Sequence, residues 1–219
     1  LVSAYKGDLQ KVTGFAALTG RGVAGVVDEV EYRVGNHRLV ESTGVCSPEI
    51  EQQLQTLEQQ GKTCLVLMSR DSVLAIFAVA DHVRETSPAA VAALKGIGIH
   101  PVVLSGDNQR TTTAVALQVG IDDARGELLP DDKLQAVVTL RATHGAVGMV
   151  GDGVNDAPAL ARADVSFAMG AAGSDTALET AGVALMADDL RGLAVFLRIS
   201  RATRQILRQN ISVALTTKG

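Results

Sequence analysis

Short segments made almost entirely of apolar residues alternate with helix-like segments over the second half of the chain. Between residues 102 and 186 these segments lack the polar alternation of a half-exposed strand. Such strands are covered on both faces, as in parallel sheets flanked by helices. The pattern predicts an α/β fold with a doubly wound parallel sheet. The expected strands are 102–104, 147–150, 165–168 and 183–186, and the expected helices are 88–95, 110–119, 131–143, 157–163 and 175–181.

Residues 11 to 80 show a different pattern, with short β-rich pieces and one helix. Ser47, followed by a proline, suits the start of a helix, and Gly61 suits its end. The polar pair Arg70-Asp71 between two apolar runs predicts a turn. These features predict an α+β region, with expected strands at 11–18, 23–30, 31–34, 63–69 and 73–80 and an expected helix at 48–60.

Composition and charge exclude several classes of protein. With 219 residues, 47% hydrophobic side chains and 20% charged ones, the chain can form one or two globular domains and is not disordered. Cys46 and Cys64 form neither a Cys-x-x-Cys pair nor a zinc-ribbon spacing, which favours a reducing compartment. Residues 1–190 carry 14 basic and 24 acidic side chains, and this net charge of −10 disfavours a nucleic-acid-binding surface.

The end of the chain is basic and then turns apolar. All charged residues after Asp189 are positive and give this tail a charge of +6: Arg191, Arg198, Arg201, Arg204, Arg208 and Lys218. This order is typical of a cytoplasmic stalk that leads into a membrane helix, although no run reaches the roughly 20 apolar residues of a full span. A solvated C-terminal helix is the alternative. The start of the chain, without Met or a signal-peptide pattern, predicts an internal part of a longer protein.

Acidic residues and glycines follow one of the expected strands. Asp152 lies between two glycines, and Asp156 lies four residues further on, at the start of a helix. Glycines permit a sharp turn and close approach of a ligand, and two carboxylates suit Mg²⁺, which prefers oxygen ligands and joins carboxylates to substrate phosphate. The alternative is a plain helix start, with Asp156 as its cap and Pro158 in its first turn.

A second polar cluster, Ser105-Gly106-Asp107, follows another expected strand. The carboxyl ends of parallel strands are where ligands bind in doubly wound folds. A simple Ser-Gly-Asp turn is the alternative. Lys133, read by itself, is an ordinary lysine in the first turn of an exposed helix.

The segment Met149-Val-Gly-Asp-Gly-Val-Asn-Asp-Ala-Pro-Ala-Leu160 resembles the hinge motif of the P-type ATPases. These are cation pumps whose phosphorylation domain belongs to the haloacid dehalogenase-like superfamily. The resemblance implies that Asp152 is a ligand of Mg²⁺ and that Asn155 and Asp156 order the phosphorylation site. Asp156 is also a candidate metal ligand, because it shares the loop with Asp152.

Three more motifs are similar to those of the family. Ser105-Gly106-Asp107 is similar to its Thr-Gly-Asp motif, and the serine hydroxyl is available to a phosphate oxygen. Lys133 resembles the lysine that the superfamily places against the phosphoryl group, where an ammonium offsets developing charge. Asp81-His82-Val83-Arg84 is similar to the Asp-Pro-x-Arg hinge, with His82 in place of proline. The charged residues of this last segment, 81–84, could otherwise belong to a solvated linker.

The first part of the chain resembles, less completely, the nucleotide-binding domain of the heavy-metal-transporting subgroup. Gly20-Arg-Gly22-Val23 is similar to its Gly-x-Gly-Val segment, and Gly35-Asn36 is similar to its Gly-Asn pair. The resemblance implies that Gly20, Gly22, Val23, Gly35 and Asn36 line the ATP site. Glycines allow close approach of the backbone, and the asparagine both donates and accepts hydrogen bonds. A lone Gly-x-Gly is more often a hairpin turn.

Two family motifs do not occur in the sequence: Asp-Lys-Thr-Gly-Thr, whose Asp accepts the phosphoryl group of ATP, and Ser-Glu-His-Pro, which binds adenine. The resemblance implies that both lie upstream of Leu1, and that the parallel sheet lacks the strand that carries the nucleophile. Two neighbouring strands are then expected to have unpaired edges. The expected domains are a partial nucleotide-binding domain (1–80), an incomplete phosphorylation domain (81–190) and a basic stalk helix with the start of a membrane helix (191–219).

The resemblance implies a cytoplasmic part of an integral membrane pump that uses ATP and Mg²⁺ to export a heavy-metal cation. Residues 171–180 and 208–218 resemble the zinc, cadmium and lead pumps more than the copper pumps. The chain alone is expected to be inactive, because the phosphorylated Asp is absent. A non-catalytic module that binds a nucleotide or a partner is the alternative. A free-standing phosphatase is disfavoured by the missing nucleophile and by the basic tail.

Overall fold

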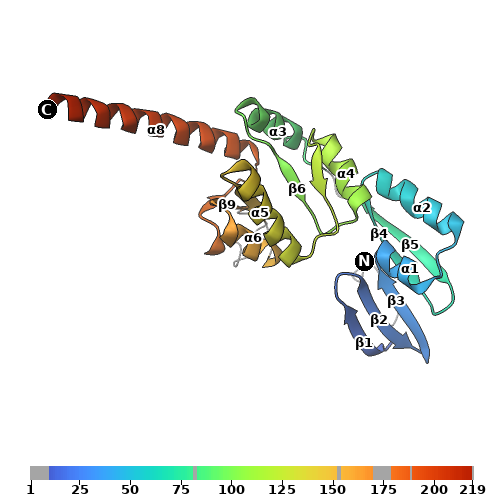
Figure 1. Cartoon of the computed structure of the whole chain (residues 1–219). Helices are drawn as coiled ribbons and strands as arrows, with labels where there is room; N and C mark the ends of the chain where they lie inside the picture. The colour runs from blue at the N-terminus through green and yellow to red at the C-terminus, as the bar shows by residue number, and fades with distance from the viewer. Residues whose placement is uncertain (1–9, 81–82, 152–153, 170–178, 188, 219) are drawn as a thin grey trace. The chain divides into compact units, whose positions relative to one another are not determined.

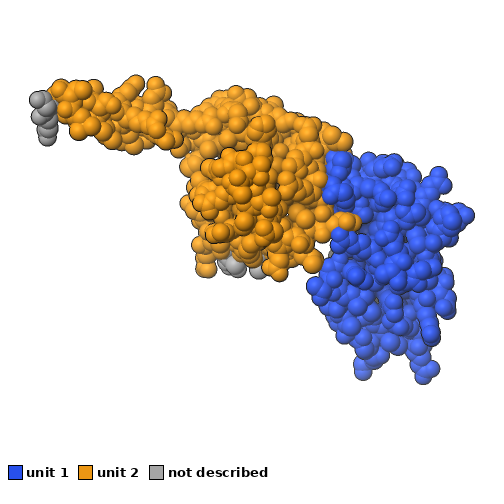
Figure 2. Space-filling model, viewed as in Figure 1, with its two compact units in different colours: residues 1–82, 106–114 blue, residues 83–105, 115–219 orange. Residues whose placement is uncertain are grey.

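A computed structural model describes residues 10–80, 83–151, 154–169, 179–187 and 189–218. The chain divides into two compact units (Figure 2). Unit 1 comprises Leu1–His82 together with Gly106–Ala114, and unit 2 comprises Val83–Ser105 and Val115–Gly219. Each unit has its own sheet structure and its own buried clusters of apolar side chains.

Unit 1 is built on a five-stranded antiparallel sheet whose strands follow one another in chain order (Figure 1). β2 and β3 form a hairpin whose turn residues, Asp28 and Glu29, both have positive φ angles, as in a type I′ turn. The sequence prediction divided these strands at Glu31, which was wrong. The turn carries neither the Asn nor the Gly that usually marks this turn type. The strands are β1 (Thr13–Leu18), β2 (Gly22–Val27), β3 (Val30–Gly35), β4 (Lys62–Met68) and β5 (Val73–Ala80).

Two helices, α1 (His37–Thr43) and α2 (Pro48–Gln59), pack against β4. The predicted helix at 48–60 is confirmed, and the predicted turn at 70–71 joins β4 to β5. The sequence analysis missed α1 because seven residues are too few to show apolar periodicity. The core between the helices and the sheet consists of Leu39, Val40, Leu54, Cys64, Val66 and Met68.

The parallel strands of unit 2 form two sheets, one with the order β10-β9-β8 and one that pairs β6 with β7. β8 and β6 each lie at an edge of their own sheet. β7 was not predicted, because it is short and begins and ends with charged residues. The strands are β6 (Val102–Leu104), β7 (Asp123–Arg125), β8 (Gly148–Gly151), β9 (Val165–Met169) and β10 (Val183–Leu185).

Helices accompany these strands, as the alternating pattern predicts. The predicted helix at 175–181 lies largely outside the described residues. The helices are α3 (Ser87–Gly96), α4 (Gln109–Gln118), whose first residues belong to unit 1, α5 (Pro130–His144), the 3-10 turn η2 (Val154–Asp156), α6 (Ala157–Arg162) and α8 (Arg191–Lys218).

The long helix α8 packs on unit 2 only through its beginning. Leu193 and Ala194 are buried, and Phe196 meets Phe167 edge to face. Further on, apolar side chains such as Leu215 are exposed. Across the parts of the chain that the structure describes, we find no helix with the length and apolarity that a membrane crossing demands.

Candidate functional site

An ion pair joins Lys133 to Asp156 in unit 2. The Lys133 Nζ lies 2.7 Å from Asp156 Oδ1, and each side chain is only 14% exposed. Lys133 belongs to the first turn of α5, and Asp156 ends η2, just before α6. The structure thus brings together two predicted site residues that are 23 positions apart in the chain.

The carboxylate of Asp156 is free to meet Lys133 because it does not cap a helix. Asp156 stands at the N-cap of α6 but makes no side-chain capping bond, and Pro158 lies in the first turn, as predicted. The alternative of a plain capped helix start therefore does not account for Asp156.

Gly151, the last residue of β8, makes room for this carboxylate. An added Cβ at Gly151 would lie 2.8 Å from the Asp156 Cβ and 3.1 Å from its Oδ2, closer than real side chains approach. A glycine at the end of the strand therefore lets the acid fold over the strand terminus, where parallel sheets bind ligands.

The other acidic and polar residues of this motif are only partly described. Asp152, the predicted ligand of Mg²⁺, lies outside the described residues. Asn155 is exposed to solvent in η2. Its predicted role in ordering the phosphorylation site stays a prediction.

Backbone bonds hold Ser105 at the end of β6, next to the start of α5. The Ser105 N–H donates to the Arg125 carbonyl at 2.9 Å, and the Leu128 N–H donates to the Ser105 carbonyl at 3.0 Å. The Asp132 carboxylate accepts from the N–H of Leu129, which fixes the first turn of α5. Ser105 and the turn that carries Lys133 are therefore tied within a few residues of each other. Gly106 and Asp107 follow as exposed residues.

The predicted nucleotide-binding residues of unit 1 are closely interlinked. The Asn36 side chain accepts from the Leu39 N–H, and thereby caps α1, while its Nδ2 donates to the Gly20 carbonyl at 2.9 Å. Gly22 pairs with Gly35 across β2 and β3. Their approach requires glycine, because an added Cβ at Gly22 would lie 2.1 Å from the Val34 carbonyl oxygen.

A cavity of about 420 Å³ lies beside these residues, against the first strands of the sheet and α1. Arg21, Arg33 and Leu39 line it together with small residues of β1 and β2. None of the five predicted nucleotide-binding residues is among its lining residues, although Arg21 lies between Gly20 and Gly22. Val23 lies in β2, half-buried. The volume of the cavity is in the range of small-molecule binding sites.

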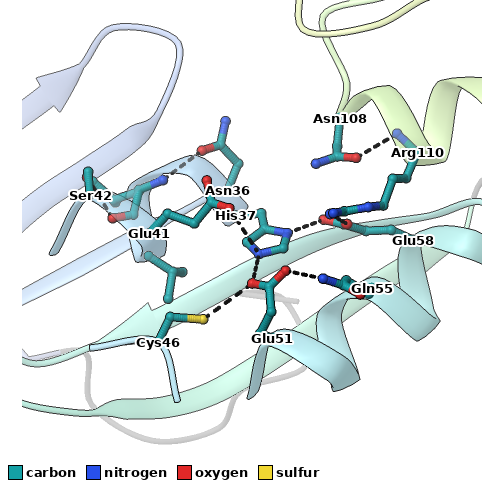
Figure 3. A network of polar contacts seen from close by, with 12 residues as sticks. Asn36, His37, Glu41, Ser42, Cys46, Glu51, Gln55, Glu58, Asn108 and Arg110 are labelled. Atoms are coloured by element: carbon teal, nitrogen blue, oxygen red, sulfur yellow. Dashed lines mark hydrogen bonds and ion pairs between the residues drawn. The ribbon is translucent and has the colours of Figure 1, made fainter. Parts of the chain in front are cut away.

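A buried charge network, which the sequence analysis missed, lies between α1 and α2 (Figure 3). His37 is 3% exposed; its Nδ1 lies 2.9 Å from Glu58 Oε1 and its Nε2 lies 2.6 Å from Glu51 Oε2. Glu58, 1% exposed, also meets the Arg110 guanidinium at 3.3 Å. The hydrogen bond that His37 donates to Glu58, together with the one that it donates to Glu51, raises the pKa of His37 to about 9 against the opposing effect of burial.

One signal in the sequence could have pointed to this network. Glu51 and Glu58 are seven residues apart in a predicted helix, so they lie on one face two turns apart. His37 directly follows the Gly-Asn pair, but nothing in the sequence places it opposite that face. Of the predicted hinge, Asp81 and His82 lie outside the described residues.

Comparisons with known proteins agree with these motifs. The haloacid dehalogenase-like hydrolase family matches residues 1–164. A probable cadmium-transporting ATPase of Staphylococcus aureus is 45% identical over 95% of this chain, which covers 26% of that protein. A copper-transporting P-type ATPase of Rhizobium leguminosarum bv. viciae is 39% identical over 93% of this chain and 24% of that protein.

A solved structure shares the fold as well. The crystal structure of a zinc-transporting PIB-type ATPase in its E2.Pi state matches 95% of this chain and 33% of that chain, with a TM-score of 0.65 and 35% identity. The chain thus spans about a quarter to a third of the length of these relatives. The chain belongs to the haloacid dehalogenase-like hydrolases and, within them, to the heavy-metal P-type ATPases.

Proposed function

We propose that this chain is the ATP-binding and phosphorylation part of a pump that couples ATP hydrolysis, through an aspartyl phosphate, to export of a heavy-metal cation. Zinc, cadmium or lead are the proposed cargo in preference to copper. The support is the identity of 45% with a probable cadmium-transporting ATPase, against 39% with a copper-transporting one. The proposed setting is the cytoplasmic side of a membrane, because the relatives are named as transporters.

The observation that carries this proposal is the Lys133–Asp156 pair at the end of β8. A lysine fixed by a carboxylate at a strand terminus presents a positive charge without the freedom of a surface side chain. Such a charge stabilises a phosphoryl group as it is transferred, because the ammonium needs no reorganisation at the moment of reaction. The hydroxyl of Ser105, tied near the same helix start, is the proposed donor to a phosphate oxygen.

The residues of this loop also fit Mg²⁺. Their donors are carboxylate oxygens, the ligands that Mg²⁺ prefers, and Gly151 leaves space for the Asp156 carboxylate over the strand end. Asp152 and Asp156 would hold the ion, which when bound would neutralise charge between carboxylate and phosphate. Lys133 keeps Asp156 oriented toward this edge of the sheet.

Unit 1 is the proposed nucleotide-binding part. The bond from Asn36 to the Gly20 carbonyl holds the glycine turn against the start of α1, next to a cavity of about 420 Å³. Gly20, Gly22, Val23, Gly35 and Asn36 are proposed to form one wall of the adenosine site. We keep the domain limits proposed from the sequence. The nucleotide-binding part is residues 1–80, the phosphorylation domain is 81–190, and the basic helix is 191–219.

The test is phosphoenzyme formation by the full-length protein that contains this chain. Membranes are incubated with labelled ATP and Mg²⁺, and the acid-stable, hydroxylamine-sensitive label is counted. We expect Lys133→Ala to reduce the initial rate of labelling at least about 100-fold, the scale of losing one charge-stabilising group. Lys95→Ala is the matched control, because Lys95 forms an exposed ion pair with Asp122.

Two results would overturn the proposal: a Lys133→Ala rate within about threefold of the parent protein, or an equal loss in Lys95→Ala. The 219-residue chain by itself provides a second sample. We expect no such label on it, because its sequence has no Asp-Lys-Thr-Gly-Thr segment.

A further inference from the structure

Three different metal-ligand side chains meet in unit 1, between α1 and α2 (Figure 3). They are His37 at the start of α1, Cys46 in the connection between the helices and Glu51 in the first turn of α2. The imidazole nitrogen, the sulfur and a carboxylate oxygen all lie within 4.8 Å of one another. We propose that these three residues bind a zinc-like divalent cation, Zn²⁺ or Cd²⁺.

The spacing of the ligand atoms is close to what zinc requires. Tetrahedral zinc, with bonds of about 2.0–2.3 Å to nitrogen, oxygen and sulfur, sets its ligand atoms roughly 3.3–3.7 Å apart. The Cys46 sulfur already lies 3.6 Å from Glu51 Oε2. The His37 Nε2 lies 2.6 Å from the same oxygen, so this pair has to open by roughly 0.8 Å. Glu51 is 30% exposed, so its side chain has room to turn.

Glu58 supplies an independent observation that His37 is oriented for a ligand. Its buried carboxylate holds the His37 Nδ1 at 2.9 Å, so the imidazole presents Nε2 to Cys46 and Glu51. A carboxylate behind a histidine is the usual support of a metal-binding imidazole, because it fixes the ring and increases its basicity. Arg110 in turn holds the other oxygen of Glu58 at 3.3 Å.

The mixture of ligand types selects the class of cation. A thiolate together with an imidazole suits Zn²⁺ and Cd²⁺, whereas Mg²⁺ and Ca²⁺ prefer oxygen alone. The fourth position belongs to water or to Glu41, whose Oε1 lies 3.9 Å from the His37 Nε2. On binding, the Cys46 thiol and the Nε2–H of the His37 imidazolium both release a proton to solvent, since the thiolate and the unprotonated nitrogen are the ligands.

The experiment titrates the 219-residue chain, stripped of metal and kept reduced without added thiols, with Cd²⁺ and with Co²⁺. We expect one equivalent of each ion to produce a thiolate-to-metal charge-transfer absorption. Cys46→Ser should lose this absorption, and Cys64→Ala should keep it, because Cys64 is a buried core residue and is not one of the three side chains whose ligand atoms meet. Circular dichroism verifies that both variants are folded.

A second measurement gives the affinity, by competition with a chromophoric zinc chelator. We expect Glu51→Gln to weaken Zn²⁺ binding more than about tenfold while the thermal transition without metal stays within a few degrees. Millimolar Mg²⁺ should not displace the bound Zn²⁺. The proposal fails if the parent chain shows no charge-transfer band, if the band survives Cys46→Ser, or if Glu51→Gln binds Zn²⁺ within twofold of the parent chain.

Discussion

The two units handle charge in opposite ways. Unit 1 encloses His37 and Glu58 in its interior, at 3% and 1% exposure, and links them to Glu51 and Arg110. Unit 2 places Lys133 and Asp156 at the end of a strand, where both keep 14% of their surface. A buried charge must be paired to be tolerated, whereas a charge at a strand end remains in reach of a ligand. The difference separates a pair that packing encloses, in which Glu58 orients His37, from a pair that lies at a strand end.

The same contrast applies to the glycines. In unit 1 Gly22 and Gly35 face each other, and their lack of side chains lets two strands meet. In unit 2 Gly151 makes space for the Asp156 carboxylate, a proposed site residue. Replacing these glycines should therefore damage folding in unit 1 and activity in unit 2.

The largest expected effect is that of Gly22→Ala on the stability of unit 1. The new Cβ would lie 2.1 Å from the Val34 carbonyl oxygen, at a φ of +148° that L residues rarely adopt. We expect a loss of about 3 kcal/mol in the free energy of unfolding, from crowding and strain together. Urea titration of the 219-residue chain, followed by tyrosine fluorescence, measures it, since Tyr32 lies in β3 of unit 1.

Gly44→Ala is the matched control for this variant. Gly44 also has a positive φ, +72°, but an added Cβ there would meet no atom within 4 Å. We expect a loss of only about 1 kcal/mol, the cost of the left-handed conformation. Equal losses in the two variants would show that crowding between the strands does not explain the destabilisation caused by Gly22→Ala.

The sequence indicated which residues of unit 2 lie together at a strand end better than it indicated the interior of unit 1. Ser105 and Asp156 follow expected strands in consecutive motifs, whereas Lys133 was named through the resemblance of its motif to the P-type ATPases. The buried network depends on packing between α1 and α2, and α1 itself is too short to be recognised from periodicity. His37 and Glu58 are 21 residues apart, and no local pattern relates them.

Some features of the fold could not be predicted from the sequence either, because they also depend on contacts between distant segments. The parallel strands were predicted from their apolar composition, but their division into two sheets depends on which edges pair in space. The hairpin at Asp28 and Glu29 uses residues that adopt positive φ less readily than glycine, so its sequence gives a weak signal.

The second prediction tests the buried network of unit 1. Glu58→Gln keeps the shape of the side chain but removes the charge that faces His37 and Arg110. We expect the free energy of unfolding at neutral pH to fall by about 2–3 kcal/mol, because a buried pair with one partner removed leaves the other uncompensated. Glu49→Gln on the same helix is exposed and should change stability by less than about 0.5 kcal/mol. A similar small change in Glu58→Gln would mean that the network contributes little.

In unit 2, two glycines of β8 differ in the space around them, and this difference gives the third prediction. Gly151→Ala should displace the Asp156 carboxylate, whereas an added Cβ at Gly148 would meet its nearest atom at 3.7 Å, an ordinary contact. In the full-length protein we expect Gly151→Ala to slow phosphoenzyme formation about tenfold, equivalent to about 1.4 kcal/mol, and Gly148→Ala to leave it unchanged. If both variants label at the parent rate, the space above Gly151 is not needed for the reaction.

The smallest effect concerns the two cysteines, which both lie in unit 1 and so report on it alone. Burial raises the pKa of Cys64 to about 11, so at pH 8 about one molecule in a thousand carries the reactive thiolate. Cys46 is half-buried and more accessible. In metal-free buffer at pH 8 we expect iodoacetamide to modify Cys46 at least about tenfold faster than Cys64, as read by mass spectrometry of peptides. The difference should vanish in urea, because unfolding exposes both thiols equally. Equal rates in the native chain would instead mean that the core around Cys64 opens readily, and the contrast between the closed core of unit 1 and the accessible strand end in unit 2 would lose its physical basis.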